Sequence, residues 1–212
     1  MREEPIRFQS GDLGLEGLLF RGSGSGGVVI THPHPLYGGS MHNNVVEAVH
    51  AAYAAKGFTT LRFNFRGVGA SEGAYDEGRG EAEDVLAAMA VLKEGGAEEI
   101  HLAGYSFGAW VIAGGLDRYA DASRIIMISP PVAFMEFPRI GPDARIGLVV
   151  TGAGDDIAPP GSVKKMAVRW NPKARLEVIP GADHFFWGAG GRLRDAIGRF
   201  LEQEAGARGE SS

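Results

Sequence analysis

The chain has 212 residues, of which 44% are hydrophobic and 22% are charged, and its formal net charge is −5. These values are typical of one globular domain spanning residues 1–212 and speak against a disordered or fibrous chain. The 21 lysines and arginines are scattered, so the basic patch of a nucleic-acid-binding protein is missing, and the absence of cysteine excludes disulfides and a thiol nucleophile.

The sequence was searched for a secretory signal, a membrane span and a disordered tail. The N-terminal stretch MREEPIRF lacks the apolar run of a secretory signal, and no segment approaches the length of a membrane-spanning helix. We therefore expect a cytoplasmic protein without a membrane partner. The last residues, EQEAGARGESS, lose the apolar periodicity, which predicts a frayed tail at about 204–212.

Predicted strands and helices alternate along most of the chain. The first two strands, 6–10 and 13–21, are separated by Gly11 and Asp12 and indicate an antiparallel hairpin. Six more strands are predicted at 28–31, 59–65, 99–105, 124–129, 145–152 and 175–180. Helices are predicted at 42–56, 80–94, 107–117, 161–169 and 190–204. This order predicts the α/β class, a three-layer α/β/α sandwich around a mostly parallel eight-stranded sheet with an N-terminal antiparallel hairpin.

Two serines have glycines at both minus two and plus two, Ser71 and Ser106. Ser106 directly follows a predicted strand and precedes the apolar helical run FGAWVIAGG. A nucleophile on such a sharp turn has a strained backbone, and only small residues such as Gly104 and Gly108 avoid a collision there. Ser71 lies in a glycine-rich loop without a following helix. We therefore predict Ser106 as a nucleophile and Ser71 as a loop serine.

A serine hydroxyl needs a neighbouring base, and the base needs an orienting carboxylate. His184 follows the last predicted strand, from where it can reach across the strand ends. The segment TGAGDDIAPP after the penultimate strand offers Asp155 and Asp156. Asp183 is a weaker candidate, because residues adjacent in sequence tend to point apart. The residues alone leave the acid open between Asp155 and Asp156, with Asp155 preferred.

An acyl-transfer site also needs backbone donors for the developing oxyanion. One is expected to be the N–H of Phe107, at the start of the helix after the nucleophile. The other is expected in THPHPLYGG, where Pro33 and Pro35 have no N–H. His34 is the first candidate donor and Leu36 the second.

Aromatic residues cluster near these positions in sequence and suggest a wall for apolar acyl or aromatic groups. Core packing explains any single one equally well. The residues expected to contact substrate are Tyr37, Tyr105 and Phe185, and the neighbouring aromatic residues are Phe107, Phe186 and Trp187.

Two other motifs were weighed against this site. Gly22, Gly24 and Gly27 form a G-x-G-x-x-G pattern, but it precedes a strand and does not open a helix, so dinucleotide binding is not expected. His32 and His34 form an H-x-H pair, a pattern that binds metal in other proteins. The prolines that alternate with them indicate that the segment HPHP serves to shape a turn. The imaginable ligands are His32, His34, His42, Asp155 and His184. We expect neither a metal nor another cofactor.

Over about residues 6–203 the chain resembles the α/β-hydrolases, in particular small bacterial cap-less serine hydrolases related to dienelactone hydrolase. The resemblance rests, in order, on HPHPLYGGSMHNNVV, LRFNFRGVGASEG, GYSFG, GAGDDIAPP and GADHFF. The chain order of serine, acid and histidine is the one expected of this fold. Aligning GAGDDIAP with the family's acid segment implies Asp155 as the acid, although Ala153 stands where the family often has a first acidic residue. The resemblance also implies that Ser71 belongs to a glycine-rich structural loop.

Only fifteen residues, PPVAFMEFPRIGPDA, separate the strand at 124–129 from the next one. This length is too short for a cap domain, so we expect an open site. The apolar residues around 131–140 could pair with a second subunit, giving a homodimer, or could simply cover the sheet.

These observations predict a serine hydrolase of the carboxylesterase type. Its substrate would be a carboxylic ester or thioester of a small, apolar acyl group, cleaved through an acyl-enzyme by Ser106, His184 and Asp155. One alternative is a peptidase or amidase, since the same triad serves amides. The other is a hydrolase-fold protein that binds a ligand without turnover, whose mark would be a damaged triad.

Overall fold

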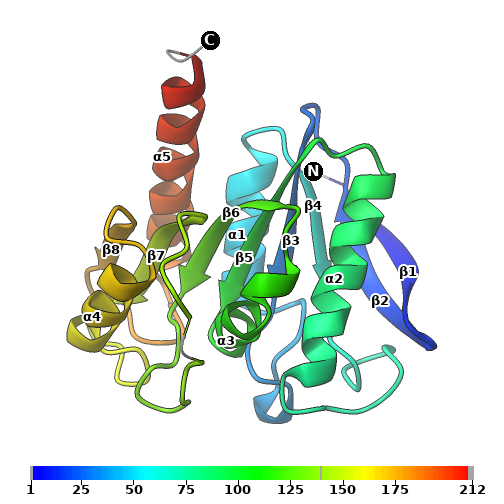
Figure 1. Ribbon diagram of the computed structural model, residues 1–212, viewed down its shortest axis with the longest axis horizontal. Helices are drawn as coiled ribbons and strands as arrows, with labels where there is room; N and C mark the ends of the chain where they lie inside the picture. Colours follow the sequence, from blue (N-terminus) through cyan, green and yellow to red (C-terminus); the bar gives the residue numbers. More distant parts are fainter. Residues whose placement is uncertain (1, 139, 210–212) are drawn as a thin grey trace.

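The computed structural model describes residues 2–138 and 140–209, and within them eight strands form one sheet (Figure 1). The strands are β1 (Glu4–Ser10), β2 (Leu13–Phe20), β3 (Gly26–Thr31), β4 (Thr59–Phe63), β5 (Glu99–Tyr105), β6 (Ala122–Ile128), β7 (Ile146–Gly152) and β8 (Arg175–Ile179). Their order in the sheet is β1-β2-β4-β3-β5-β6-β7-β8. The two pairs that involve β2 are antiparallel, and the other described pairs are parallel.

Helices cover both faces of this sheet. They are α1 (Asn44–Ala54), α2 (Arg79–Glu94), α3 (Phe107–Gly114), α4 (Pro160–Trp170) and α5 (Gly190–Gly209), with short 3-10 turns at Pro35–Tyr37 and Leu116–Arg118. α1 and α5 pack on one face, and α2, α3 and α4 pack on the other (Figure 1). The predicted three-layer α/β/α sandwich with an N-terminal antiparallel hairpin is therefore confirmed.

Successive side chains of the central strands contribute in turn to the two hydrophobic cores, one on each face of the sheet. In β6, Ile125 and Met127 belong to the core under α2, α3 and α4, whereas Ile126 and Ile128 belong to the core under α1 and α5. Successive side chains of a strand point to opposite faces, so a strand covered on both sides is apolar without interruption. This is why the runs at the centre of the chain were predicted to within a few residues.

The last helix is longer than predicted. α5 continues to Gly209, whereas the sequence suggested an end at 204 and a frayed tail beyond it. Two polar contacts hold its later part against the sheet: Arg175 donates from Nη1 to Gln203 Oε1 at 2.6 Å, and Arg124 forms an ion pair with Glu204. Polar tethers of this kind leave no apolar periodicity in the sequence. Residues 210–212 lie outside the described part of the chain.

Among residues 2–138 and 140–209, no helix has both the length and the apolar character that crossing a bilayer requires.

A buried histidine fixes the loop that leaves β3. His32 donates from Nδ1 to the carbonyl oxygen of Pro33 at 2.7 Å and accepts at Nε2 from the N–H of Phe65 at 3.0 Å. Its ring also lies edge-on to the Phe65 ring, 4.7 Å between centroids. Burial lowers the pKa of His32 to about 4, so the ring is neutral and holds the loop after β3 against the loop after β4.

We expect His32 to make folding stability depend on pH. Its pKa rises from about 4 in the folded chain to the ordinary 6.5 on unfolding, so the unfolded chain binds the extra proton and stability falls as pH drops through this window. Between pH 7 and pH 5 the loss due to this group is about 2 kcal/mol. Urea unfolding at both pH values should therefore show a flatter pH dependence for His32→Gln than for the unaltered protein.

His42 is exposed and provides the control. His42→Gln should keep the full pH dependence, because it removes an exposed imidazole and leaves the buried His32 in place. Equal pH slopes for His32→Gln and the unaltered protein would contradict a buried neutral His32.

Candidate active site

Ser106 occupies the turn between β5 and α3 in a strained conformation. Its φ is 53° and its ψ is −116°, a backbone conformation that residues other than glycine rarely adopt. Its N–H donates to the carbonyl oxygen of Ile128 on the neighbouring strand at 2.9 Å. The turn is therefore anchored to the sheet, and the serine side chain is thrust past the end of β5.

The two glycines that flank this turn have no room for a side chain. A Cβ on Gly104 would lie 2.7 Å from the Cα of Ala109, and a Cβ on Gly108 would lie 2.8 Å from the Cβ of Thr31 and 2.9 Å from the carbonyl oxygen of His32. The glycine spacing in the sequence thus has a steric cause. It lets α3 pack directly against β5 and β3.

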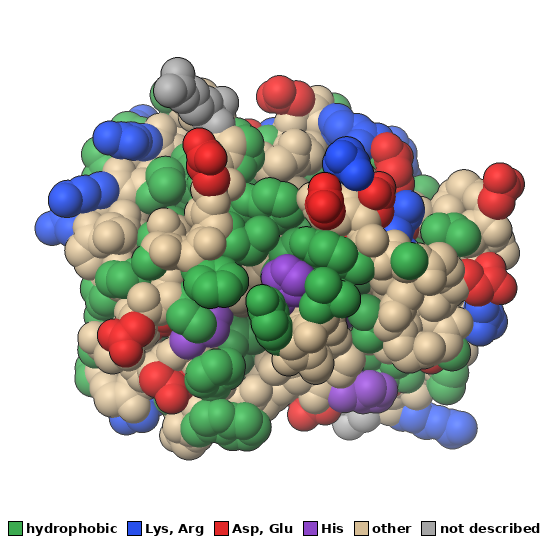
Figure 2. Space-filling model, turned by 90° about the horizontal axis from the view of Figure 1, so that it is seen from below, with side chains coloured by type: hydrophobic (Ala, Val, Ile, Leu, Met, Phe, Trp, Pro, Cys, Tyr) green, Lys and Arg blue, Asp and Glu red, His purple; other side chains and the backbone are tan. Residues whose placement is uncertain are grey.

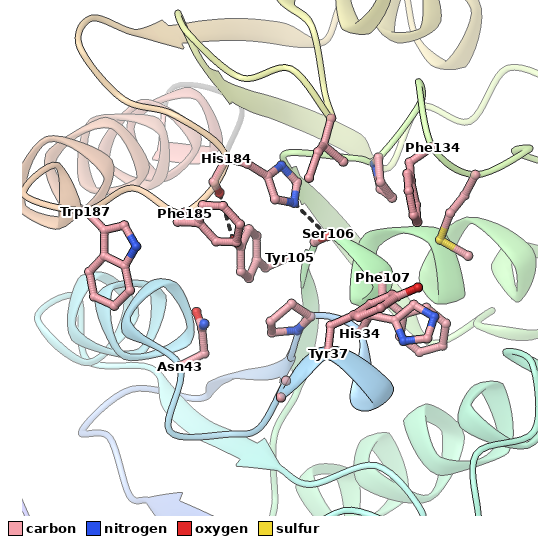
Figure 3. Close-up of a pocket in the computed structure, with 16 residues that line it drawn as sticks. His34, Tyr37, Asn43, Tyr105, Ser106, Phe107, Phe134, His184, Phe185 and Trp187 are labelled. Carbon is pink, nitrogen blue, oxygen red and sulfur yellow. Dashed lines mark hydrogen bonds between the residues drawn. The ribbon is translucent and has the colours of Figure 1, made fainter.

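Three side chains from different strand ends form one hydrogen-bonded chain. The Oγ of Ser106 lies 2.9 Å from His184 Nε2 (Figure 3), and His184 Nδ1 lies 3.0 Å from each carboxylate oxygen of Asp155. Asp155 follows β7 and His184 follows β8. All three side chains are buried. This arrangement can take a proton from the serine and stabilise the imidazolium that results.

The Asp155 carboxylate is held by several donors. Oδ1 accepts the N–H groups of Ile157 at 3.0 Å and Ala158 at 2.6 Å, and Oδ2 accepts the hydroxyl of Ser129 at 2.6 Å. Burial by itself raises the pKa of Asp155, but the hydrogen bond and charge of His184 and the other donors outweigh it, so the pKa lies below the ordinary value. Asp155 is thus kept ionised and fixed in orientation.

The two other acidic candidates lie elsewhere. Asp156 is exposed. Asp183 accepts the N–H of Phe185 at 2.9 Å and so closes the turn that carries His184. The carboxylate that meets the imidazole is therefore that of Asp155, the residue preferred from the sequence.

Sequence reasoning missed Ser129 as a partner of Asp155. Ser129 stands just past β6 with a φ of 42°, and its N–H donates to the carbonyl oxygen of Val150 at 2.7 Å. Its place at the carboxyl end of a parallel strand was the available signal, since polar residues at such ends face the site.

The loop after β3 and the start of α3 bring two backbone N–H groups to the site. In the described chain neither the N–H of His34 nor that of Phe107 donates to another residue. The N–H of Leu36, the second candidate donor, is engaged with His34 Nδ1 at 3.3 Å. The His34 ring packs on Phe107, 4.7 Å between centroids, which holds the two loops together.

Ser106 and His184 open into a cavity of about 520 Å³ (Figure 3). Figure 2 looks onto this face and shows hydrophobic side chains gathered around the histidines near its centre. Among the described residues, no Asp, Glu, Lys or Arg lines the cavity. Its other lining residues are Pro33, His34, Tyr37, Gly38, Gly39, Asn43, Tyr105, Phe107, Pro131, Phe134, Met135, Ile157, Phe185 and Trp187.

The three residues expected to contact substrate all line this cavity, but they differ in exposure. Tyr37 and Phe185 are exposed at its rim, whereas Tyr105 is buried. The Tyr105 hydroxyl donates to the carbonyl oxygen of His184 at 2.8 Å. Tyr105 thus also fixes the loop that carries the histidine.

The segment between β6 and β7 forms part of the cavity wall. Pro131, Phe134 and Met135 line the cavity, whereas the sequence suggested only a subunit contact or a cover for the sheet. The described residues of this segment, 129–138 and 140–145, contain no helix. The mouth of the cavity is therefore not roofed by a helical insertion there.

The remaining motifs have structural partners. Ser71 donates from Oγ to the carbonyl oxygen of Asn64 at 2.7 Å and accepts the N–H of Glu16 at 3.0 Å, so its hydroxyl ties its loop to β2 and to the residue after β4. The glycine-rich stretch at 22–27 leads into β3 and not into a helix. Within the described chain, no three His, Asp or Glu side chains are placed to share a metal ion.

Comparison with known proteins agrees with this geometry. Residues 28–159 match the model of the alpha/beta hydrolase family. The uncharacterized protein RP471 of Rickettsia prowazekii is 36% identical over 168 residues, which cover 74% of this chain and 71% of that protein.

Solved structures extend the similarity to nearly the whole chain. An α/β serine hydrolase homologue from Coxiella burnetii superposes with a TM-score of 0.87 at 36% identity, covering 95% of this chain and 98% of the other. A serine hydrolase without a lid from Xanthomonas campestris gives a TM-score of 0.86 at 28% identity, covering 96% and 95%. These similarities support a hydrolase. The family match and the near-complete superpositions establish that the chain belongs to the alpha/beta hydrolase family.

Proposed function

We propose that this protein is a serine hydrolase that cleaves carboxylic esters or thioesters through an acyl-enzyme. The observation that carries the proposal is the unbroken hydrogen-bonded chain from Ser106 through His184 to Asp155, set on a strained turn beside an apolar cavity. A strained, buried serine with a positioned base is the arrangement that activates a weak nucleophile.

In the first half-reaction, His184 Nε2 takes the proton of Ser106 as Oγ attacks the carbonyl carbon. Asp155 stabilises the imidazolium by charge and by its hydrogen bond to Nδ1. The N–H groups of Phe107 and His34 donate to the oxyanion of the tetrahedral intermediate. The intermediate collapses, Nε2 protonates the leaving alcohol or thiol, and the acyl group stays on Ser106.

In the second half-reaction, water takes the place of the alcohol. His184 removes a proton from the water as its oxygen attacks the acyl-enzyme, and then returns that proton to Ser106 Oγ. The acid product leaves and the resting state is restored. Each step uses only water and the side chains and backbone N–H groups of the chain itself, so the proposed reaction requires no cofactor.

We expect a fluorophosphonate to label Ser106 and p-nitrophenyl esters to be turned over. Ser106→Ala should abolish the adduct, and His184→Ala should slow labelling by about 10³-fold or more, because the serine loses its base. Intact and peptide mass spectrometry on the three proteins measure this. An adduct on Ser71, or none on the unaltered protein, would contradict the proposal, and labelling without turnover would favour a binding protein.

The neighbouring aspartates provide a matched pair for testing the acid. Asp155→Asn should lower kcat by about 10²- to 10⁴-fold, because an amide cannot both accept from His184 Nδ1 and satisfy the donors on its other side. Asp156→Asn should leave kcat within about twofold, since that side chain is exposed. Similar losses in the two variants would argue against Asp155 as the orienting carboxylate.

The backbone donor at His34 can be removed by a substitution that the φ of His34 allows. His34 has a φ of −57°, which proline accepts, so His34→Pro deletes the N–H while His34→Ala keeps it. Both variants lose the ring. We expect kcat to be about 10²-fold lower for His34→Pro than for His34→Ala. Equal kcat values in two variants with the same thermal midpoint would assign the second donor elsewhere.

A further inference from the structure

Large hydrophobic side chains are exposed mainly at the mouth of the cavity. Among the described residues, those with more than a third of their surface exposed are Leu36, Tyr37, Phe134, Val168, Val178, Phe185 and Trp187. Four of them line the cavity: Tyr37, Phe134, Phe185 and Trp187. Their exposed fractions run from 51% to 75%. Exposed aromatic surface gathered at one mouth indicates contact with a ligand that extends beyond the cavity.

These side chains form two walls on opposite sides of Ser106 (Figure 3). The first wall consists of Asn43, Phe185 and Trp187. The second consists of His34, Tyr37 and Phe134. In the second wall the Tyr37 and Phe134 rings meet edge-on, 6.5 Å between centroids, and His34 lies 4.9 Å from Tyr37.

The chemistry of ester cleavage assigns a half of the substrate to each wall. His184 Nε2 must reach the leaving oxygen to protonate it, so the leaving group lies on the His184 side of the carbonyl carbon. Phe185 and Trp187 belong to the same loop as His184 and border that side. The acyl chain then points the other way, along Tyr37 and Phe134. The first wall is therefore the leaving-group wall, and the second is the acyl wall.

Asn43 adds one polar group to the leaving-group wall. Its Oδ1 accepts the N–H of Val45 at 2.9 Å as the N-cap of α1, which fixes the amide. Its Nδ2 donates to no other described residue. The neighbouring Asn44 donates from Nδ2 to the carbonyl oxygen of Phe185 at 2.9 Å and so ties α1 to the His184 loop. The wall is held in place and offers one free hydrogen-bond donor.

We propose that the substrate is an uncharged ester with two extended apolar halves: an aromatic leaving group that carries a hydrogen-bond acceptor, and an acyl chain longer than acetyl. An uncharged substrate fits because no charged side chain lines the described cavity, where an ionic group would lose hydration without a partner. Such a substrate is larger than the small acyl compound expected from the sequence. This inference rests on the proposed function, since the walls are defined by attack from Ser106.

Three acetate and hexanoate esters separate the two walls. Benzyl acetate against ethyl acetate tests the leaving-group wall, and ethyl hexanoate against ethyl acetate tests the acyl wall. Trp187→Ala should lower the kcat/KM ratio of the first pair by about tenfold, and Phe134→Ala should lower the ratio of the second pair by about tenfold. In each variant the kcat/KM ratio of the other pair should stay within about twofold of its value in the unaltered protein. Val168→Ala, an exposed apolar residue of α4, is the matched control.

The free donor is tested with acetylbenzyl esters. The unaltered protein should prefer 3- or 4-acetylbenzyl acetate over benzyl acetate, and Asn43→Ser should lose that preference while keeping the N-cap oxygen of α1. No preference in the unaltered protein would overturn the acceptor on the leaving group.

Labelling of Ser106 by a fluorophosphonate separates failure of this inference from failure of the proposed function. If Ser106 is not labelled and no ester is turned over, the proposed function fails. If Ser106 is labelled and esters are cleaved, but Trp187→Ala and Phe134→Ala change both ratios equally or neither, the assignment of the two walls is wrong.

Discussion

The site depends on the close packing of α3 against β5 and β3 around the turn at Ser106. Ser106 has a φ of 53°. This backbone conformation costs about 1–3 kcal/mol of conformational free energy relative to an ordinary one, and it persists only where the surrounding packing enforces it. This packing is possible because Gly104 and Gly108 have no side chain. The backbone of α3 therefore lies closer to β5 and to the end of β3 than a Cβ at either position would allow. If α3 moved away from the sheet, Ser106 would lose both its position past the end of β5 and the neighbouring helix N–H of Phe107.

The rest of the site is assembled by loops that leave parallel strands at one edge of the sheet. Each loop is fixed by a different polar contact: Asp155 by the N–H groups of Ile157 and Ala158, His184 by the Tyr105 hydroxyl, and the loop after β3 by His32. These contacts are buried or partly buried, where a lost partner leaves a polar group without a hydrogen bond. The loops are therefore held with little freedom around Ser106, which keeps the proton path short.

The cavity is mainly apolar because aromatic and other hydrophobic side chains surround Ser106 and His184. Its central polar groups are those of Ser106, His184 and the backbone of the loop after β3, and the walls on either side consist mainly of aromatic rings, with the Asn43 amide in one of them. Because the segment after β6 is short and without a described helix, the rings at the mouth stay open to solvent. The same segment that leaves the site unroofed supplies Phe134, so access and wall chemistry have a common origin.

Local patterning in the sequence determined the strands, the helices, the strand–turn–helix context of Ser106 and the identity of Phe107 as the residue after it, because these features depend on neighbours along the chain. It also put Ser71 aside, since no helix follows it. The choice of Asp155 over Asp156, the tie from Ser129, the lining by Phe134 and the length of α5 depended on side chains far apart in sequence. Such contacts form only when the sheet brings the strand ends together. The spacing of apolar residues indicates which side chains of a strand face the core, but it does not indicate which residues of other segments they meet.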